Sequence, residues 1–280
     1  MLMNLLHKAS NIAMLSFVVS SMLAMGTGLL VAQIIEPLRN ARLVMLALAA
    51  NFILMPIGAF ALATLLGLDE SFGIGLLVLG CAAGAPFLPK LAELAKGDLP
   101  FAVGTMVLLM VVTVAYLPIV LPLLLPGVTV NPKQIALSLV FMMLLPLGIG
   151  LLLRAFFEKA ATRLKPWLDW LSNLSLVLLI GLITAANIDK VLQVFGTRGI
   201  LAGLLFIAFG FGIGWLLGGP GSATKRVLAL GTAQRNIAAA LVVASQSFSD
   251  PKVVVMVIVV AIVGLVTIMP FARVLAKPKG

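Results

Sequence analysis

Two basic residues lie inside apolar stretches of the sequence, where a charged side chain is costly. Arg235 stands between two amide residues in LGTAQRNIAAALVVA, and Lys90 ends the stretch GCAAGAPFLPK. A lysine or arginine at the centre of a membrane span costs roughly 2.5–3.5 kcal/mol on insertion scales. A cation retained at that cost is expected to bind an anion, to pair with another side chain, or to hold polar groups in place.

Three roles compete for these two cations. The guanidinium of Arg235 could hold a carboxylate ligand through two parallel hydrogen bonds. Either cation could instead be tethered among carbonyl and amide oxygens, in the place that a free metal cation would fill. The third role is a structural pair, because Glu93 follows Lys90 by three residues and shares its helical face. Such a pair could also pass a proton.

Further polar residues lie in or near the same stretches, and Cys81 is the single cysteine. The polar candidates are Asn51, Thr232, Gln234 and Asn236. Each could be a ligand of a substrate or an ion, and hydrogen bonding between helices is an equally good use for such side chains. A single cysteine rules out an intrachain disulfide or a cysteine zinc cluster, and Cys81 is expected to pack in the core.

The elements that must position these residues are membrane-spanning helices. Of the 280 residues, 62% are hydrophobic and 10% are charged, whereas a soluble domain is about half apolar and a quarter charged. The net charge of +10 does not indicate nucleic-acid binding, because the basic residues are scattered between apolar segments. We therefore predict an all-α integral membrane protein.

A helix needs about 20 apolar residues to cross the bilayer. Nine segments meet or approach that length, namely 11–34, 42–66, 72–95, 99–125, 133–155, 166–187, 199–218, 224–248 and 252–275.

The basic residues between these segments predict the orientation of the chain. Five of them fall on one side of the membrane and twelve on the other. The positive-inside rule makes the richer side cytoplasmic, so the N-terminus is expected outside and the C-terminus inside. Lys90 and Arg235 are the two that remain, and both fall within apolar segments.

The segments before and after 133–155 read as two copies of one unit. FILMPIGAFALATLLG in the first copy is echoed by IAFGFGIGWLLGG in the second, and the stretches with Lys90 and Arg235 fall at corresponding places. Corresponding segments lie an odd number of spans apart, so the two copies must be inverted in the membrane. Inverted repeats are typical of secondary transporters, whose substrate site lies near mid-membrane between discontinuous helices.

Two segments are expected to be broken near the bilayer centre. Gly84, Pro86 and Pro89 interrupt 72–95, because proline removes a backbone donor and clashes with the preceding turn. The polar run around Arg235 interrupts 224–248. Freed carbonyls at that depth are tolerated only inside protein or against a watery cavity. We therefore predict two broken helices that cross at mid-membrane.

Together these stretches resemble the bile acid:sodium symporter family. NFILMP resembles the family's amide-F-x-x-M-P, GCAAGAPFLPKLAELAKGD resembles its broken fourth helix, and GTAQRNIAAALVVA resembles its broken ninth helix with G-x-x-Q. The resemblance covers nearly the whole chain and implies a nine-helix form that lacks the family's first helix. It implies a panel of 11–34, 133–155 and 166–187 that moves against a core. The core would comprise 42–66, 72–95, 99–125, 199–218, 224–248 and 252–275.

The family couples the movement of organic anions to sodium, and this sequence departs from its sodium ligands. The family's glutamate before G-x-x-Q falls near Leu230, and its Ser-Asn pair falls on Leu88 and Pro89. The remaining ligands are the amides Asn51 and Gln234, whereas hard cations prefer oxygen ligands of which some are charged. Sodium coupling is therefore left open, and replacement of sodium by potassium is expected to matter little. No other cofactor is expected.

These observations predict a secondary active transporter of small organic anions in a bacterial inner membrane, and not an enzyme. An arsenite-efflux permease of the same superfamily is the close alternative, because such permeases rely on a cysteine in the broken helix, where Cys81 stands. A membrane sensor and an intramembrane enzyme are the less favoured alternatives. A sensor would ordinarily carry an output domain, and none is evident between the apolar segments. An intramembrane enzyme would need paired acid and base groups or metal ligands, which the apolar segments do not supply. The identity of the substrate, the direction of transport and the oligomeric state stay open.

Overall fold

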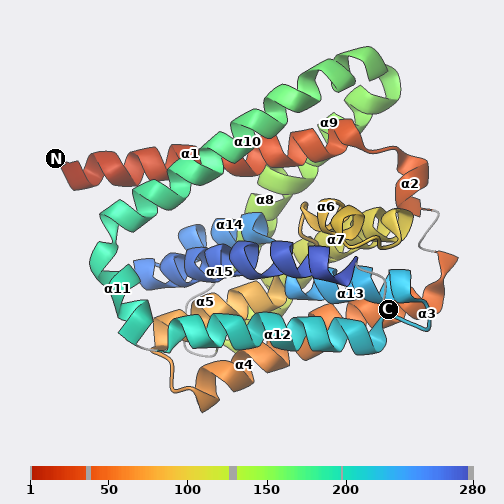
Figure 1. The fold of residues 1–280 in the computed structure, drawn as a ribbon. Coiled ribbons are helices and arrows are strands. Elements are labelled where there is room, and N and C mark those ends of the chain that lie inside the picture. Colours follow the sequence, from red (N-terminus) through yellow and green to blue (C-terminus); the bar gives the residue numbers. More distant parts are fainter. Residues whose placement is uncertain (1, 36–38, 126–130, 197, 277–280) are drawn as a thin grey trace.

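The computed structural model describes residues 2–35, 39–125, 131–196 and 198–276, and the regular elements in these ranges are all helices (Figure 1). Two of them, η2 and η3, are π-helical turns inside longer helices. The first half contains α1 Leu2–Gly28, α2 Val31–Ile35, α3 Ala41–Ala49, η2 Ala50–Leu54, α4 Met55–Leu65, α5 Glu70–Cys81, α6 Leu88–Leu94 and α7 Leu99–Leu124. The second half contains α8 Pro132–Leu139, η3 Val140–Leu144, α9 Leu145–Phe156, α10 Glu158–Ala186, α11 Ile188–Gly196, α12 Gly199–Leu217, α13 Ser222–Ala233, α14 Ile237–Ser247 and α15 Pro251–Leu275.

The number of membrane crossings agrees with the sequence. Eight helical stretches in the described chain are long and apolar enough to span a bilayer. The ninth predicted crossing consists of α5 and α6, which are each too short to span alone. The start of α1 and the end of α15 lie at opposite ends of the bundle (Figure 1). The prediction of an all-α integral membrane protein is confirmed.

Several helices extend beyond the predicted segments. α1 begins at Leu2 rather than near residue 11, and α10 begins at Glu158 rather than near 166. α11 was not predicted, and α2 is separated from α1 although one segment was predicted over 11–34. Hydropathy marks only the part of a helix that suits hydrocarbon, whereas charged turns outside that part form helix equally well.

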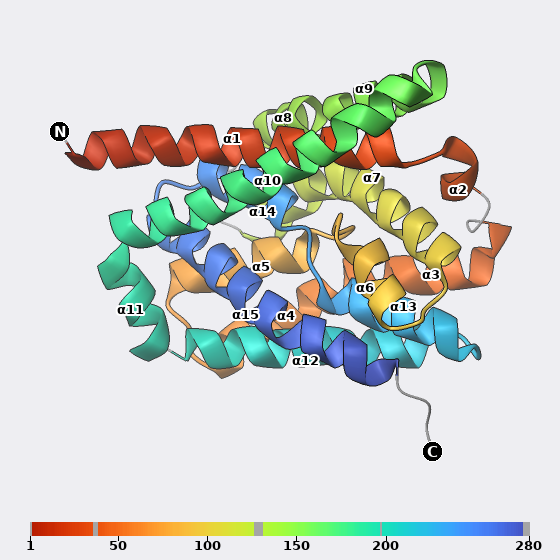
Figure 2. The ribbon, with the colours of Figure 1, turned by 45° about the horizontal axis from the view of Figure 1, so that its top comes forward.

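α1 lies alongside α9 and α10 across one side of the bundle (Figures 1 and 2). The backbones of α1 and α9 are close, because a Cβ on Gly26 would lie 2.4 Å from the carbonyl oxygen of Leu147. A Cβ on Gly150 would lie 2.7 Å from the carbonyl oxygen of Leu23. Small residues allow such approach between membrane helices. These helices, with α8, are the predicted panel, and their movement against the core stays a prediction.

Corresponding helices of the two predicted repeats run in opposite directions (Figure 1). The course of α3 and α4 is opposite to that of α12, and the course of α5 is opposite to that of α13. The interrupted helices occupy the interior. Of the most apolar window in Ser222–Ser247, 94% is buried, against 22% of the window in α10. The polar residues of α13 and α14 therefore lie among protein rather than lipid.

A polar cluster ties the start of α5 to the start of α15. Asp69 caps α5 by accepting from the Ser71 backbone N–H, and Asp250 caps α15 by accepting from that of Lys252. The Ser71 hydroxyl donates to Asp250 at 2.6 Å, and Lys252 pairs with Asp69 at 3.0 Å. Partial burial raises the pKa of Asp250, but these hydrogen bonds and nearby lysine charges outweigh it and leave the pKa below its ordinary value.

The unwound segment after α5 comes very close to α7 at Gly84. The φ angle of Gly84 is +79°, a left-handed conformation that disfavours residues with a side chain. A Cβ there would lie 2.3 Å from the backbone nitrogen of Met110 and 2.7 Å from the carbonyl oxygen of Met106. Both atoms belong to the backbone of α7, so the clash is relieved only by moving the helix or the segment.

We predict that Gly84→Ala destabilises the protein by about 1–3 kcal/mol, the usual cost of a strained backbone position. The readout is the thermal unfolding midpoint of the purified protein in detergent. Gly148→Ala is the matched control, because Gly148 is helical and its Cβ would meet nothing within 4 Å. Equal midpoints for the two variants would contradict the close approach described here.

Candidate functional site

Two unwound segments meet where α5 and α13 end. α5 ends at Cys81 and α6 begins at Leu88, while α13 ends at Ala233 and α14 begins at Ile237. The backbone N–H of Asn236 donates to the carbonyl oxygen of Ala82 at 3.0 Å. These helices cross within the bundle (Figure 2). The two predicted broken helices are confirmed, and we call residues 82–87 together with 234–236 the crossing.

Asn236 holds the two segments of the crossing together. Its side-chain nitrogen donates to the carbonyl oxygen of Gly84 at 3.0 Å, and its side-chain oxygen accepts from the backbone N–H of Ala239 at 3.1 Å. The second bond caps the N-terminus of α14. The single buried amide of Asn236 thus satisfies the free carbonyl of Gly84 and one free N–H at the start of α14.

Thr113 of α7 anchors the first segment from the other side. Its hydroxyl donates to the carbonyl oxygen of Ala83 at 3.1 Å and accepts from the N–H of the same residue at 3.0 Å. Both backbone groups of Ala83 are therefore satisfied by one buried hydroxyl. Sequence reasoning missed Thr113, although a threonine in an otherwise apolar helix is a signal for such a contact.

The π-helical turn η2 exposes backbone oxygens toward the crossing. The N–H of Met55 reaches back five residues to Ala50, and the next residue, Pro56, has no N–H to offer. The carbonyl oxygens of Asn51 and Phe52 are thus left without their helical donors. The Tyr116 hydroxyl donates to Phe52 at 2.6 Å. Sequence reasoning missed Tyr116 as well.

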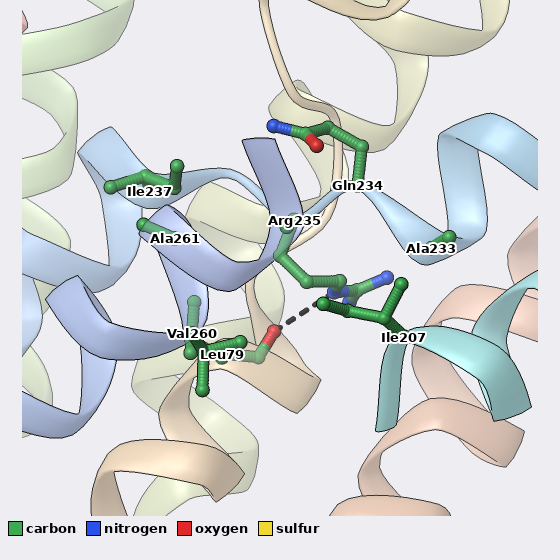
Figure 3. A pocket seen from close by; sticks show the side chains of 9 residues that line it. Leu79, Ile207, Ala233, Gln234, Arg235, Ile237, Val260 and Ala261 are labelled. Atoms are coloured by element: carbon green, nitrogen blue, oxygen red, sulfur yellow. Dashed lines mark hydrogen bonds between the residues drawn. The ribbon is translucent and has the colours of Figure 1, made fainter. Parts of the chain in front are cut away.

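Arg235 fills the space between α5, η2 and α13. Its Nε donates to the carbonyl oxygen of Leu79 at 2.9 Å, the bond drawn in Figure 3. One terminal nitrogen donates to the Asn51 side chain at 2.6 Å and to the Thr232 carbonyl oxygen at 3.3 Å. The other donates to the Gly80 carbonyl oxygen at 2.7 Å and to that of Asn51 at 3.5 Å.

These contacts use the whole hydrogen-bonding capacity of the guanidinium. It has five N–H donors, and five oxygens of the chain receive them. Arg235 is only 4% exposed. The cavity beside it measures about 10 Å³, which is space for about one water molecule. A carboxylate ligand therefore has neither a free donor nor room at this guanidinium in the structure.

The charge of Arg235 is balanced by dipoles. Among the described residues, no aspartate or glutamate forms an ion pair with it. The carbonyls of Leu79 and Gly80 belong to the last turn of α5, and that of Thr232 to the last turn of α13. The C-terminus of a helix carries roughly half a negative charge. Two such termini meet at one positive group.

Asn51 and Thr232 belong to the same network as Arg235. The side-chain nitrogen of Asn51 donates to the Thr232 hydroxyl at 3.2 Å and to the Ala47 carbonyl oxygen at 3.0 Å. Both side chains are fully buried. Four of the predicted site residues, Asn51, Thr232, Arg235 and Asn236, are therefore brought together at the crossing, each with partners from the chain itself.

Gln234 points to the opposite side of its segment from Arg235 (Figure 3). It is 6% exposed, and within the described ranges its side-chain amide has no hydrogen-bonding partner. The Asn51 and Gln234 amides, predicted as the remaining sodium ligands, therefore do not meet at one site: Asn51 is bonded to Arg235, and Gln234 points away from it. Gln234 alone among the polar residues of this segment keeps an uncommitted amide.

Lys90 and Glu93 lie apart from this network. The ammonium of Lys90 donates to the Glu93 carboxylate at 2.8 Å, and the two side chains are 56% and 62% exposed. Both belong to α6. Lys90 and Arg235 therefore do not share a site in this structure, because the Lys90 side chain is largely exposed and Arg235 is buried. Whether the pair has a role in transport stays a prediction.

An all-helical bundle with inverted repeats and two interrupted helices that cross inside it is the architecture of a multi-pass membrane transporter. A model of the Sodium Bile acid symporter family matches residues 14–194. The chain belongs to this family.

Several curated relatives are similar over most of the chain. The "Uncharacterized sodium-dependent transporter YocS" of Bacillus subtilis is 28% identical over 70% of this chain and 60% of its own length. The "Probable sodium/metabolite cotransporter BASS6, chloroplastic" of Arabidopsis thaliana is 26% identical over 78% of this chain and 57% of its own. The chain thus spans about 60% of the length of these two relatives.

We predict that Thr113→Val destabilises the protein by about 1–3 kcal/mol, because it leaves both buried backbone groups of Ala83 without a partner. Thermal unfolding in detergent measures the effect. Thr267→Val is the control of equal size, since the Thr267 hydroxyl donates only to carbonyl oxygens of its own helix. A Thr113 variant as stable as this control would show that the anchor is dispensable.

Proposed function

We propose that the protein is a secondary active transporter of small organic anions that works by alternating access, with the panel moving against the core. The observation that carries this proposal is a permanent cation buried at the crossing with no acidic partner among the described residues. The membership of the family and the names of its relatives, which describe sodium-dependent transport of metabolites, support a small-molecule substrate.

The guanidinium of Arg235 is proposed to act on the substrate by fixing the shape of the crossing, not by direct contact. Its donors are all engaged by the chain. The free amide of Gln234 lies on the other side of the same segment (Figure 3), and its side-chain nitrogen can donate to an anion. We assign substrate contact to Gln234 and a positioning role to Arg235, Asn51, Thr232 and Asn236.

The exposed pair of Lys90 and Glu93 is proposed to be a surface ion pair. Pairs this exposed are screened by solvent and contribute little to stability. No contact links them to the crossing in the described chain. The arsenite alternative gains nothing from the structure, because the Cys81 thiol is fully buried and soft metalloid binding needs an accessible thiolate.

The membrane and the orientation belong to the same proposal. A bacterial relative supports the inner membrane, and the excess of basic residues on one side supports an N-terminus outside and a C-terminus in the cytoplasm. Sodium is proposed to be dispensable, because the Asn51 amide oxygen and the carbonyl oxygens beside the crossing are already bonded to Arg235. The remaining predicted ligand, Gln234, is a neutral amide.

We predict that proteoliposomes accumulate a small carboxylate and that Arg235→Ala abolishes this uptake. The substrate is first found by thermal-shift screening of aliphatic and aromatic monocarboxylates, because a ligand that binds the native state raises its stability. Arg273→Gln, which removes an exposed cation at the end of α15, is expected to transport normally. Normal uptake by a folded Arg235→Ala variant would refute the proposed positioning role.

We predict that replacing external sodium by potassium changes the initial rate of uptake by less than about twofold, within the variation expected when no binding energy is lost. Uptake of the carboxylate identified above is compared in sodium, potassium and choline chloride at equal ionic strength. A rate that collapses only when sodium is removed would show that a sodium site operates despite the missing carboxylate.

A further inference from the structure

We propose that the place of the Arg235 guanidinium is a monovalent-cation site that the chain fills with its own side chain. The proposal deepens the part of the proposed function that concerns cations, and it does not depend on which anion is carried. Its consequence is that removal of the guanidinium makes the stability of the crossing depend on a cation supplied from solution.

The oxygens around the guanidinium are those of a cation site. Four are backbone carbonyls, from Leu79, Gly80, Asn51 and Thr232, and the fifth is the side-chain oxygen of Asn51. Neutral carbonyl oxygens can replace the hydration shell of monovalent cations in membrane proteins. A divalent ion would be expected to require carboxylates as well, and none contacts this group in the described chain.

The charge at the site fits a single positive charge. α5 and α13 both end there, and each helix C-terminus carries roughly −0.5 of an elementary charge. The two together amount to roughly −1, which the guanidinium neutralises. Without Arg235, this negative potential would lie in a region where Asn51, Gly80 and Thr232 are fully buried, and uncompensated charge there is costly.

The local sequence builds the site independently of the arginine. The Met55 N–H reaches back to Ala50 and Pro56 has no N–H, so the Asn51 carbonyl has no helical donor. Within the described residues, the interruption after Cys81 also leaves the Gly80 carbonyl without a backbone donor, while the Leu79 carbonyl accepts one bond from the Ala82 N–H. These features do not disappear when Arg235 is replaced. The oxygens would then need either a new cation or water, and a buried cluster of acceptors without donors favours the cation.

The test is the thermal unfolding midpoint of Arg235→Ala, purified in detergent, as sodium, potassium or methylguanidinium chloride replaces choline chloride at constant ionic strength. We expect a saturable rise of roughly 5 °C or more at concentrations well above the dissociation constant. Methylguanidinium is included because it restores the missing fork of donors, whereas sodium and potassium restore only the charge. Wild type and Arg235→Lys, which keep a tethered cation, are expected to show no such rise.

Two further variants separate the site from general effects of salt. Arg235→Ala combined with Asn51→Ala removes one ligand and should lose at least half of the rise. Arg226→Ala is the matched control, because Arg226 also donates to helix-terminal carbonyls, those of Ala95 and Lys96, but is only partly buried. Water can replace its side chain, so this variant should respond to none of the three cations.

Specific outcomes would overturn the proposal. One is a folded Arg235→Ala variant that is indifferent to all three cations, and another is a wild type that shows the same saturable rise. Failure to recover Arg235→Ala in any salt, while Arg235→Lys folds, would also overturn it, because a free cation should rescue the variant. Rescue by a cation in a protein that transports no carboxylate would leave the cation site standing and refute only the proposed substrate class.

Discussion

The structure depends on one constraint: a backbone group that leaves its helix inside an apolar environment must find another partner. The two interrupted helices free carbonyls and N–H groups at the crossing, and side chains from three directions receive them. Asn236 joins the two segments, Thr113 holds the first against α7, and the Tyr116 hydroxyl takes the carbonyl that Pro56 releases. Arg235 takes the largest share. Because all these contacts converge, the interrupted backbone is held without lipid or bulk water.

The crossing also sorts its polar side chains by direction. On one side of residues 234–236, a guanidinium is fully committed to oxygens of the chain. On the other side, the amide of Gln234 is almost buried and has no partner within the described residues (Figure 3). Adjacent residues therefore have different roles. Arg235 bonds to the chain itself, whereas Gln234 keeps an amide that can bind a ligand. The unwound backbone allows this, because successive side chains of an extended segment point to opposite sides.

Much of the fold was predictable, because apolar length and proline placement are local properties of the sequence. The nine predicted crossings and the interruption of 72–95 follow from them, the interruption of 224–248 follows from its polar run, and Arg235 was recognised by its cost alone. Its partners were not predictable. The carbonyls of Leu79 and Gly80 carry no sequence signature, and the π-helical turn before Pro56 decides which oxygens face the crossing. For Lys90, the pair with Glu93 was one of three predicted roles, and the sequence could not choose among them, since hydropathy cannot tell that a long side chain reaches the surface.

A covalently attached cation cannot dissociate, and this has a thermodynamic consequence. An ion that enters on one side of a membrane and leaves on the other delivers the free energy of its gradient, whereas a side chain bonded to residue 235 returns to where it started in every cycle. The five oxygens that hold the Arg235 guanidinium are therefore excluded from energy conversion while it stays in place. Any concentrative work must be driven by a species that binds elsewhere, or by the gradient of the solute itself.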